Sequence, residues 1–208
     1  MIPRYQKVLF VILLIASVAM GVTLWRLRQS AHRRLLAGEA SAPTQAPEVA
    51  PSEQATLIAA NDADNSLVPQ VHSLPLPADP EARARAVLGK LLELYAAPDA
   101  THSAPGGATS VAQVFLLPVP GSKTSHDPGA KLAVVDLTGT FAASHPSGLE
   151  TETLTVLSIC ATLHANLPQV TEVRFLVDGQ PRPTLAGHAD LTRTYLTADA
   201  APAEGAKP

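Results

Sequence analysis

The sequence predicts an α/β domain of the α+β type, in which a mixed sheet of four to five strands carries two helices on one face. Two amphipathic segments with helix-start signals and one almost wholly apolar strand carry this prediction. The predicted element order is β-β-α-β-β-α-β, and one transmembrane helix precedes it. The length of 208 residues fits one such domain with flanking segments.

The first two strands are predicted to form a hairpin. Residues 55–60 and 67–74 are mostly apolar, and the turn-forming residues 61–65 separate them. Within this turn, Asp62 and Asp64 have the first ligand spacing of a calcium loop, but the glycine and the closing glutamate of such a loop are missing. A hairpin turn is therefore preferred to a calcium site.

Both helices are predicted from a start signal that is followed by an apolar stripe. Asp79 is a candidate N-cap, and the proline and glutamate that follow it favour a first helical turn. Apolar residues then recur at three- and four-residue spacing up to Tyr95. The second helix is predicted to begin at the capping-box spacing of Ser147 and Glu150 and to end before Pro168.

Three further strands complete the predicted sheet, at residues 111–117, 131–137 and 172–177. The middle one is apolar almost throughout, which favours a central position. The last one alternates between apolar and polar residues and ends in the turn pair Asp178 and Gly179. Since each helix has one wide apolar stripe, both are expected to pack on the same face of the sheet.

An uncharged segment at residues 8–25 predicts a membrane-spanning helix. At about 1.5 Å per residue it is roughly 27 Å long, close to the thickness of the hydrocarbon core. A cleaved signal peptide is the alternative, which is disfavoured because basic residues follow the segment directly and a small-x-small site lies far downstream. Basic residues on both sides leave the orientation open.

These features divide the chain into four parts. Residues 1–28 are predicted as the N-terminal transmembrane anchor, 29–54 as a Pro/Ala-rich linker, 55–197 as the folded domain and 198–208 as a disordered tail. The linker lacks apolar periodicity and contains several prolines, which is typical of a tether.

The composition excludes several functional classes. With 15 Lys and Arg against 18 Asp and Glu, the net charge is -3, so no nucleic acid partner is expected. The single cysteine, Cys160, excludes a disulfide within the chain, and its place on an apolar stripe predicts an inert buried thiol. The seven histidines have no paired spacing and are expected in solvated loops, except for a half-exposed His164 on the second helix. Since no catalytic motif is present, neither enzyme activity nor a cofactor or metal is expected.

Five segments follow one another in an informative order, at residues 132–138, 148–152, 161–163, 173–179 and 184–191. Together they resemble the GerM-like (GerMN) domain of sporulation and spore germination proteins. The resemblance implies an extracytoplasmic module, related in topology to ring-building motifs of secretion and sporulation complexes, without recognised catalytic residues. Many relatives are lipoproteins with a cysteine just after the apolar segment. Here no cysteine lies there, so the anchor is expected to be the helix itself.

Eight residues are candidate interaction or structural-motif residues. Asp190 is expected to cap backbone amides in a tight turn. Asp136 lies after an apolar strand and Glu150 and Glu152 open the second helix, so these carboxylates could form a pair able to move protons. Capping is the alternative role of Asp136 and Glu150. The full set is Asp136, Glu150, Thr162, Asp178, Gly179, Gly187, His188 and Asp190.

The expected function is a membrane-anchored, extracytoplasmic interaction or assembly module of the cell envelope that performs no catalysis. Its expected partners are the membrane, through the single-pass anchor, and either another envelope protein or a second copy of the chain. An envelope polymer-binding or hydrolytic protein with a cleft at Asp136, Glu150 and His188 is the alternative. A solute-binding sensor with a large apolar pocket is a third.

Overall fold

The computed structural model describes residues 20, 52–119 and 129–200. The predicted anchor, most of the predicted linker and the end of the chain lie outside the described residues. No helix in the described ranges has the length and apolar character needed to cross a membrane. The chain divides into two units, Met1–Glu48 and Val49–Pro208, and the following description concerns the second.

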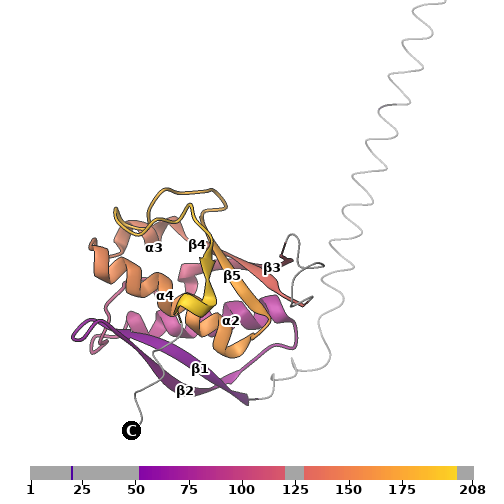
Figure 1. Ribbon diagram of the computed structural model, residues 1–208, viewed down its shortest axis with the longest axis horizontal. Coiled ribbons are helices and arrows are strands. Elements are labelled where there is room, and N and C mark those ends of the chain that lie inside the picture. The colour runs from indigo at the N-terminus through magenta and orange to yellow at the C-terminus, as the bar shows by residue number, and fades with distance from the viewer. Residues whose placement is uncertain (1–19, 21–51, 120–128, 201–208) are drawn as a thin grey trace, which may run out of the picture. The chain divides into compact units, whose positions relative to one another are not determined.

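The second unit contains strands, helices and short 3-10 turns in an order close to the predicted one (Figure 1). The strand β1 begins at Ser52 instead of Ala55, and the predicted tail contributes its first residues to the 3-10 turn η2. The short helix α3 was not predicted. In chain order, the elements are β1 (Ser52–Asn61), β2 (Ser66–Pro75), α2 (Pro80–Tyr95), η1 (Gly107–Ser110), β3 (Val111–Pro118), β4 (Lys131–Leu137), α3 (Gly139–Ser144), α4 (Leu149–Asn166), β5 (Val170–Val177), β6 (Tyr195–Leu196) and η2 (Thr197–Ala200).

The strands form two sheets where the sequence predicted one. The larger is a four-stranded mixed sheet with the order β3-β4-β5-β6, in which β4 and β5 are parallel and the other neighbours antiparallel. This confirms the predicted mixed sheet. The hairpin of β1 and β2 is a separate two-stranded sheet, so its inclusion in the main sheet was wrong.

The separation of the hairpin has a physical cause at the second edge of β1. Its outward amides are bound by helix side chains in place of another strand. The amide of Thr56 donates to Asn166 Oδ1 at 3.1 Å, and the amide of Ile58 donates to Thr162 Oγ1 at 2.8 Å. The amide of Ala60 donates to the Tyr95 hydroxyl at 2.8 Å. These three amides are therefore satisfied by side chains, and the carbonyl of Thr56 also accepts from Asn166 Nδ2 at 2.7 Å, so this stretch of β1 does not pair with the larger sheet.

The bond between Thr162 and Ile58 leads to a stability prediction. Thr162→Val keeps the shape of the side chain but removes the acceptor of a fully buried amide. We expect the free energy of unfolding to fall by about 1–3 kcal/mol in urea denaturation. Thr153→Val, on the same helix without a described side-chain hydrogen bond, is the matched control, and equal stability of the two variants would contradict the prediction.

The two long helices start differently from each other. For α2 the prediction is confirmed, because Asp79 is the N-cap and its Oδ2 accepts from the amide of Ala82 at 2.8 Å. The second helix α4 begins in the predicted place, but the N-cap is Gly148 and makes no side-chain capping bond. Glu150 is exposed, and Glu152, two positions past the end of the predicted capping box, accepts from the Gly148 amide at 3.1 Å. The predicted roles of Ser147 and Glu150 in capping were therefore wrong.

The core lies between the two sheets and is filled by α2 and α4 (Figure 1). Leu88 and Leu91 of α2 and Ile159 of α4 are fully buried, as are the alternate residues of β4 and β5 that point at the helices, such as Val135 and Val173. Both helices thus pack on one face of the four-stranded sheet, as predicted. The opposite face of that sheet is not covered by a helix of the described residues.

Candidate functional site

Three of the predicted residues lie together where the parallel strands β4 and β5 end. Asp136 Oδ1 accepts from the amide of Gly179 at 2.8 Å, and Asp178 Oδ1 accepts from the amide of Gly139 at 2.8 Å. Each carboxylate thus binds the loop that follows the neighbouring strand. An added Cβ at Gly139 would lie 2.2 Å from Asp178 Oδ2, so this contact needs a glycine there. Both carboxylates hold the strand ends in register.

The turn after β5 is the two-residue type expected from its sequence. Asp178 and Gly179 have φ angles of 51° and 72°, both in the left-handed region. Val177 and Gln180 close the turn, with each amide donating to the carbonyl of the other at 2.9 and 3.1 Å. The geometry explains the choice of Asp and Gly without reference to a ligand.

A second group of predicted residues surrounds the carboxylate of Glu152, which is not among the eight candidate residues. This side chain is fully buried at the start of α4. Its Oε2 accepts from the amides of Ala186, His188 and Ala189, each at 2.9 Å, and its Oε1 accepts from His188 Nδ1 at 2.9 Å. Burial alone raises the pKa of Glu152, but these hydrogen bonds more than offset burial and lower the pKa to about 2. The ionised carboxylate therefore fastens this loop to the helix.

The same loop contains the predicted turn around Asp190. Asp190 Oδ1 accepts from the amide of Thr192 at 2.8 Å and from its hydroxyl at 2.6 Å. These two bonds, with the hydroxyl bond the stronger, hold the pKa of Asp190 below its ordinary value. Gly187 has a φ of 126°, which a side chain would strain. The environment of both residues is that of a structural turn.

No described hydrogen bond or ion pair joins any two of the residues of the predicted cleft, Asp136, Glu150 and His188. Asp136 binds the turn after β5, whereas His188 binds Glu152 on α4. Thr162 is fully buried and bound to β1, so it offers no surface to a partner. Structural roles in turns and loops thus account for most of the eight predicted residues.

The face of the four-stranded sheet that points away from the helices is a different kind of surface. Three large apolar side chains on it are strongly exposed, with relative accessibilities of 43% for Phe115, 48% for Leu117 and 50% for Leu196. Partly buried apolar side chains continue the patch across β4 and β5. We call this surface the open sheet face, and it consists of Gln113, Phe115, Leu117, Leu132, Val134, Asp136, Glu172, Arg174, Leu176 and Leu196.

A comparison with family models identifies the family of this chain. The family model described as "Germane: Sporulation and spore germination" matches residues 52–183, which is most of the described chain. The chain belongs to the Germane family. The match begins at the first residue of β1 and includes both sheets of the domain apart from β6, together with Glu152. The resemblance to the GerMN domain expected from the sequence is therefore confirmed.

The solved structures that match this chain are distant from it in sequence. The tandem GerMN domains of the sporulation protein GerM from Bacillus subtilis match with 16% identity and a TM-score of 0.43, over 72% of this chain and 48% of that one. The first GerMN domain alone has 15% identity and a TM-score of 0.37, over 70% and 97%. A candidate lipoprotein from Clostridium perfringens has 20% identity and a TM-score of 0.34, over 75% and 95%.

This Germane chain thus spans about half the length of the tandem GerM structure. No curated protein matches the chain. Membership of the family rests on the match to the family model, and that model is described by a biological process and not by a reaction.

The Germane domain also contains a buried polar network that the sequence did not indicate. His102 and His145 have relative accessibilities of 0% and 5%, so their expected place in solvated loops was wrong. The Nε2 atoms of both rings lie within hydrogen-bond distance of Thr155 Oγ1, at 2.7 and 2.8 Å. His102 Nδ1 lies 2.6 Å from Asp62 Oδ1, and His145 Nδ1 lies 2.8 Å from the Pro146 carbonyl oxygen.

The partners in this network constrain the positions of its protons. His145 Nδ1 faces the Pro146 carbonyl oxygen and must carry a proton, so a neutral His145 can only accept at Nε2. The single proton of the Thr155 hydroxyl has two acceptors within reach, His145 Nε2 at 2.8 Å and the Thr151 carbonyl oxygen at 3.1 Å. A neutral His145 selects the first of these. Burial lowers the pKa of His145, which agrees with a neutral ring there.

The order carboxylate, imidazole and hydroxyl is also found in hydrolases, but here it serves a structural purpose. Thr155 is fully buried, so no substrate could reach its hydroxyl. The four residues come from the β1–β2 turn, the loop after α2, the loop after α3 and α4 itself. Because these segments are far apart in the sequence, no local motif could have indicated the network.

Two other predictions about ionisable residues agree with the structure. Cys160 is fully buried, and burial raises the pKa of its thiol, as expected for an inert residue. His164 is half-buried on α4, and its Nδ1 donates to the carbonyl of Val170 at 3.1 Å. In the described part of the chain, no group of three His, Cys, Asp or Glu side chains is arranged to hold a metal ion.

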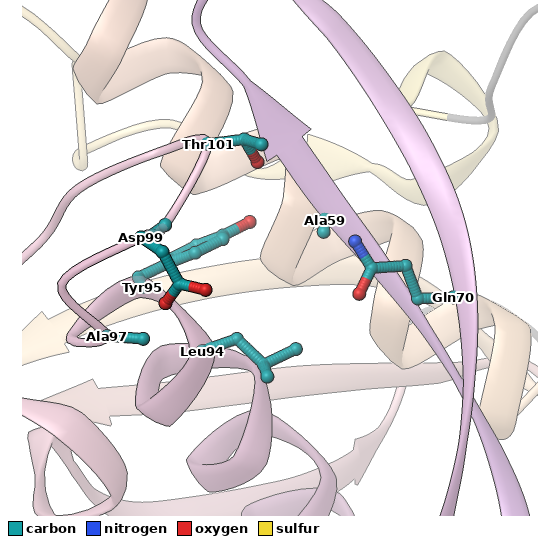
Figure 2. Close-up of a pocket in the computed structure, with 8 residues that line it drawn as sticks. Ala59, Gln70, Leu94, Tyr95, Ala97, Asp99 and Thr101 are labelled. Carbon is teal, nitrogen blue, oxygen red and sulfur yellow. The ribbon is translucent and has the colours of Figure 1, made fainter.

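Pockets of the Germane domain lie along the groove between β2 and α2. One of about 200 Å³ is formed by Ala59, Gln70 and the end of α2, and Figure 2 shows Asp99 and Gln70 on opposite sides of it. Another of about 320 Å³ lies between Leu74 and Gly89. Ligand pockets usually measure about 300–1,000 Å³, so the first pocket is smaller than this range and the second lies at its lower limit. Neither is lined by Asp136, Glu150 or His188.

Proposed function

We propose that this Germane protein is an interaction or assembly module of the cell envelope that performs no catalysis and binds a protein partner through its open sheet face. The observation that carries the proposal is the exposure of Phe115 and Leu117 on β3, beside the half-buried Leu132 and Val134 of β4. Leu196 is exposed on the same face, beyond the charged residues of β5. Isolated exposed apolar residues are common, but several gathered on one face are typical of an interaction site.

The roles of the polar residues support a non-catalytic module. A catalytic carboxylate or imidazole must reach a substrate, whereas Glu152 is fully buried and binds backbone amides. His188 is directed by Glu152, and Asp136 and Asp178 each hold an amide of a neighbouring loop. The carboxylates and the imidazole that could be interpreted as catalytic are thus hydrogen-bonded to loops of the domain.

We further propose that residues 1–28 anchor the protein in the membrane and that the domain lies outside the cytoplasm. The support is the uncharged segment at residues 8–25, followed by a proline-rich stretch long enough to clear the lipid headgroups. Reporter proteins fused after Gln54 test the topology. Activity of an exported reporter is expected, and activity only of a cytoplasmic reporter would refute the proposed location.

Site-specific photo-cross-linking in the native cells tests the interaction surface. A photoreactive amino acid at Phe115 or Leu196 is expected to give a discrete adduct of higher mass. The matched control is Glu93, which is exposed on α2 on the opposite side of the sheet. Adducts at the control position but not at the sheet positions would contradict the proposal, as would the absence of adducts at all three.

A further inference from the structure

The residues of the open sheet face are arranged in two rows that run across the strands. The pairing of the strands places Leu117, Leu132, Glu172 and Leu196 side by side in one row. The neighbouring row consists of Phe115, Val134 and Arg174, and Arg174 continues it to Thr194 through a bond from its Nε to Thr194 Oγ1 at 2.9 Å. Each row is apolar on β3 and β4 and carries one charge on β5, of opposite sign in the two rows.

These two rows are complementary to each other. A two-fold axis that lies in the plane of the interface, across the strands and between the rows, exchanges one row with the other. A second copy placed by this axis sets Leu117 against Phe115 and Leu132 against Val134. It also sets Glu172 against Arg174, twice by symmetry. Such self-complementarity is the requirement for an isologous dimer.

We propose that the partner of the open sheet face is a second copy of this chain, bound face to face about this two-fold axis. The inference rests on the proposed function of this surface and adds the identity of the partner. Aligned packing of two sheets through one face each is a common arrangement, with the strands of the two sheets about 30° from parallel or antiparallel.

The charges on β5 are available for this contact. In the described part of the chain, neither Glu172 nor Arg174 takes part in an ion pair within the domain. The bond to Thr194 uses only Nε of Arg174, so its two terminal nitrogens remain as donors for a carboxylate. A charge pair that forms only between copies explains why opposite charges interrupt an otherwise apolar surface.

The size of the face predicts a weak dimer. With strands about 4.8 Å apart and a rise of about 3.3 Å per residue, the four-stranded sheet measures roughly 15 by 25 Å. This corresponds to several hundred Å² per copy, less than the roughly 800 Å² per partner of a standard interface. Association is therefore expected at high local concentration, as for chains held in one membrane, and reversible in dilute solution.

Charge reversal distinguishes this geometry from other modes of association. In Glu172→Arg or Arg174→Glu alone, both symmetry-related pairs carry like charges, and we expect dimerisation to weaken by about tenfold or more. In the double variant E172R/R174E the opposite charges face each other again, and dimerisation is expected to recover. The measurement is sedimentation of the full chain in detergent over a concentration series.

A mixture of the two single variants gives the sharpest result. In a mixed dimer, every pair between positions 172 and 174 has opposite charges, so the two variants are expected to associate with each other more strongly than either does with itself. Wild-type behaviour of both single variants, or a mixture no better than its components, would overturn the inference. Thermal unfolding checks that all variants are folded, since both side chains lie at the surface.

The failure of this inference can be distinguished from the failure of the proposed function. If charge reversal has no effect while photo-cross-links at Phe115 attach a different protein, the second-copy inference fails and the interaction surface stands. If cross-linking at Phe115 and Leu196 yields no adduct, the interaction surface itself fails.

Discussion

Glu152→Gln is expected to lower the free energy of unfolding by about 3–5 kcal/mol, the largest effect of a single isosteric change in this domain. The carboxylate accepts five hydrogen bonds, three of them from backbone amides on Oε2. An amide side chain has one acceptor oxygen, and its NH2 group would face donors in a fully buried site. The measurement is urea denaturation, with Glu150→Gln, an exposed residue on the first turn of the same helix, as the control. A loss below about 1 kcal/mol would show that the loop is held by other contacts.

The same carboxylate predicts a dependence of stability on acid. Its pKa falls from 4.5 to about 2 on folding. Because the folded form binds the proton less tightly than the unfolded form, Glu152 stabilises the fold above pH 4.5, and this contribution is lost as the pH falls toward 2. The lost contribution is on the order of 3 kcal/mol. Glu152→Gln should be markedly less sensitive to pH in this window, and an identical pH profile of the two proteins would contradict the assignment.

Thr155→Val is expected to have the second largest effect, a loss of about 2–4 kcal/mol. The substitution keeps the shape of the side chain but leaves the Nε2 atoms of His102 and His145 without a partner in the core. Of its two described hydrogen-bond partners, the buried His102 ring would then retain only Asp62.

Urea denaturation measures this loss, and NMR of the imidazole nitrogens tests its cause. The spectra of the unmodified protein are expected to show His145 neutral with the proton on Nδ1. Since burial lowers the pKa of His145 from 6.5, the unfolded chain takes up a proton first, and stability should decline as the pH falls below about 6.5. A His145 ring protonated at both nitrogens at neutral pH would refute the proton assignment.

The elements of the fold could be predicted from the sequence because their signals are local. Asp79 marks the start of α2 within a single turn, and the alternation in β5 ends at Asp178 and Gly179 as the turn requires. The short helix α3 had no such signal. It has only six residues, and its N-cap is Thr138, whose hydroxyl accepts from the Phe141 amide at 3.4 Å.

The placement of the hairpin could not be predicted, because its cause is not local. The partners of β1 are the side chains of Thr162 and Asn166, more than a hundred positions along the chain. The role of Glu152 was missed for a similar reason. A glutamate in the first turn of a helix is explained by the helix dipole, and only the fold reveals that the loop at residues 186–189 closes over it.

The attachment of β1 to α4 has a consequence for the order in which the domain matures. The amides of Thr56 and Ile58 in β1 lack their native acceptors until the ribosome has synthesised Thr162 and Asn166. The hairpin therefore cannot dock completely during most of the synthesis of the domain. During that time its exposed edges are open to pairing with other chains. Thr56, Ile58 and Ala60 lie opposite Val71, Pro69 and Leu67, so Pro69 occupies an outward position on β2 and removes one donor there. On the β2 edge of the nascent hairpin, this proline hinders pairing with another strand. The β1 edge stays open until α4, the last α-helix in chain order, has been synthesised.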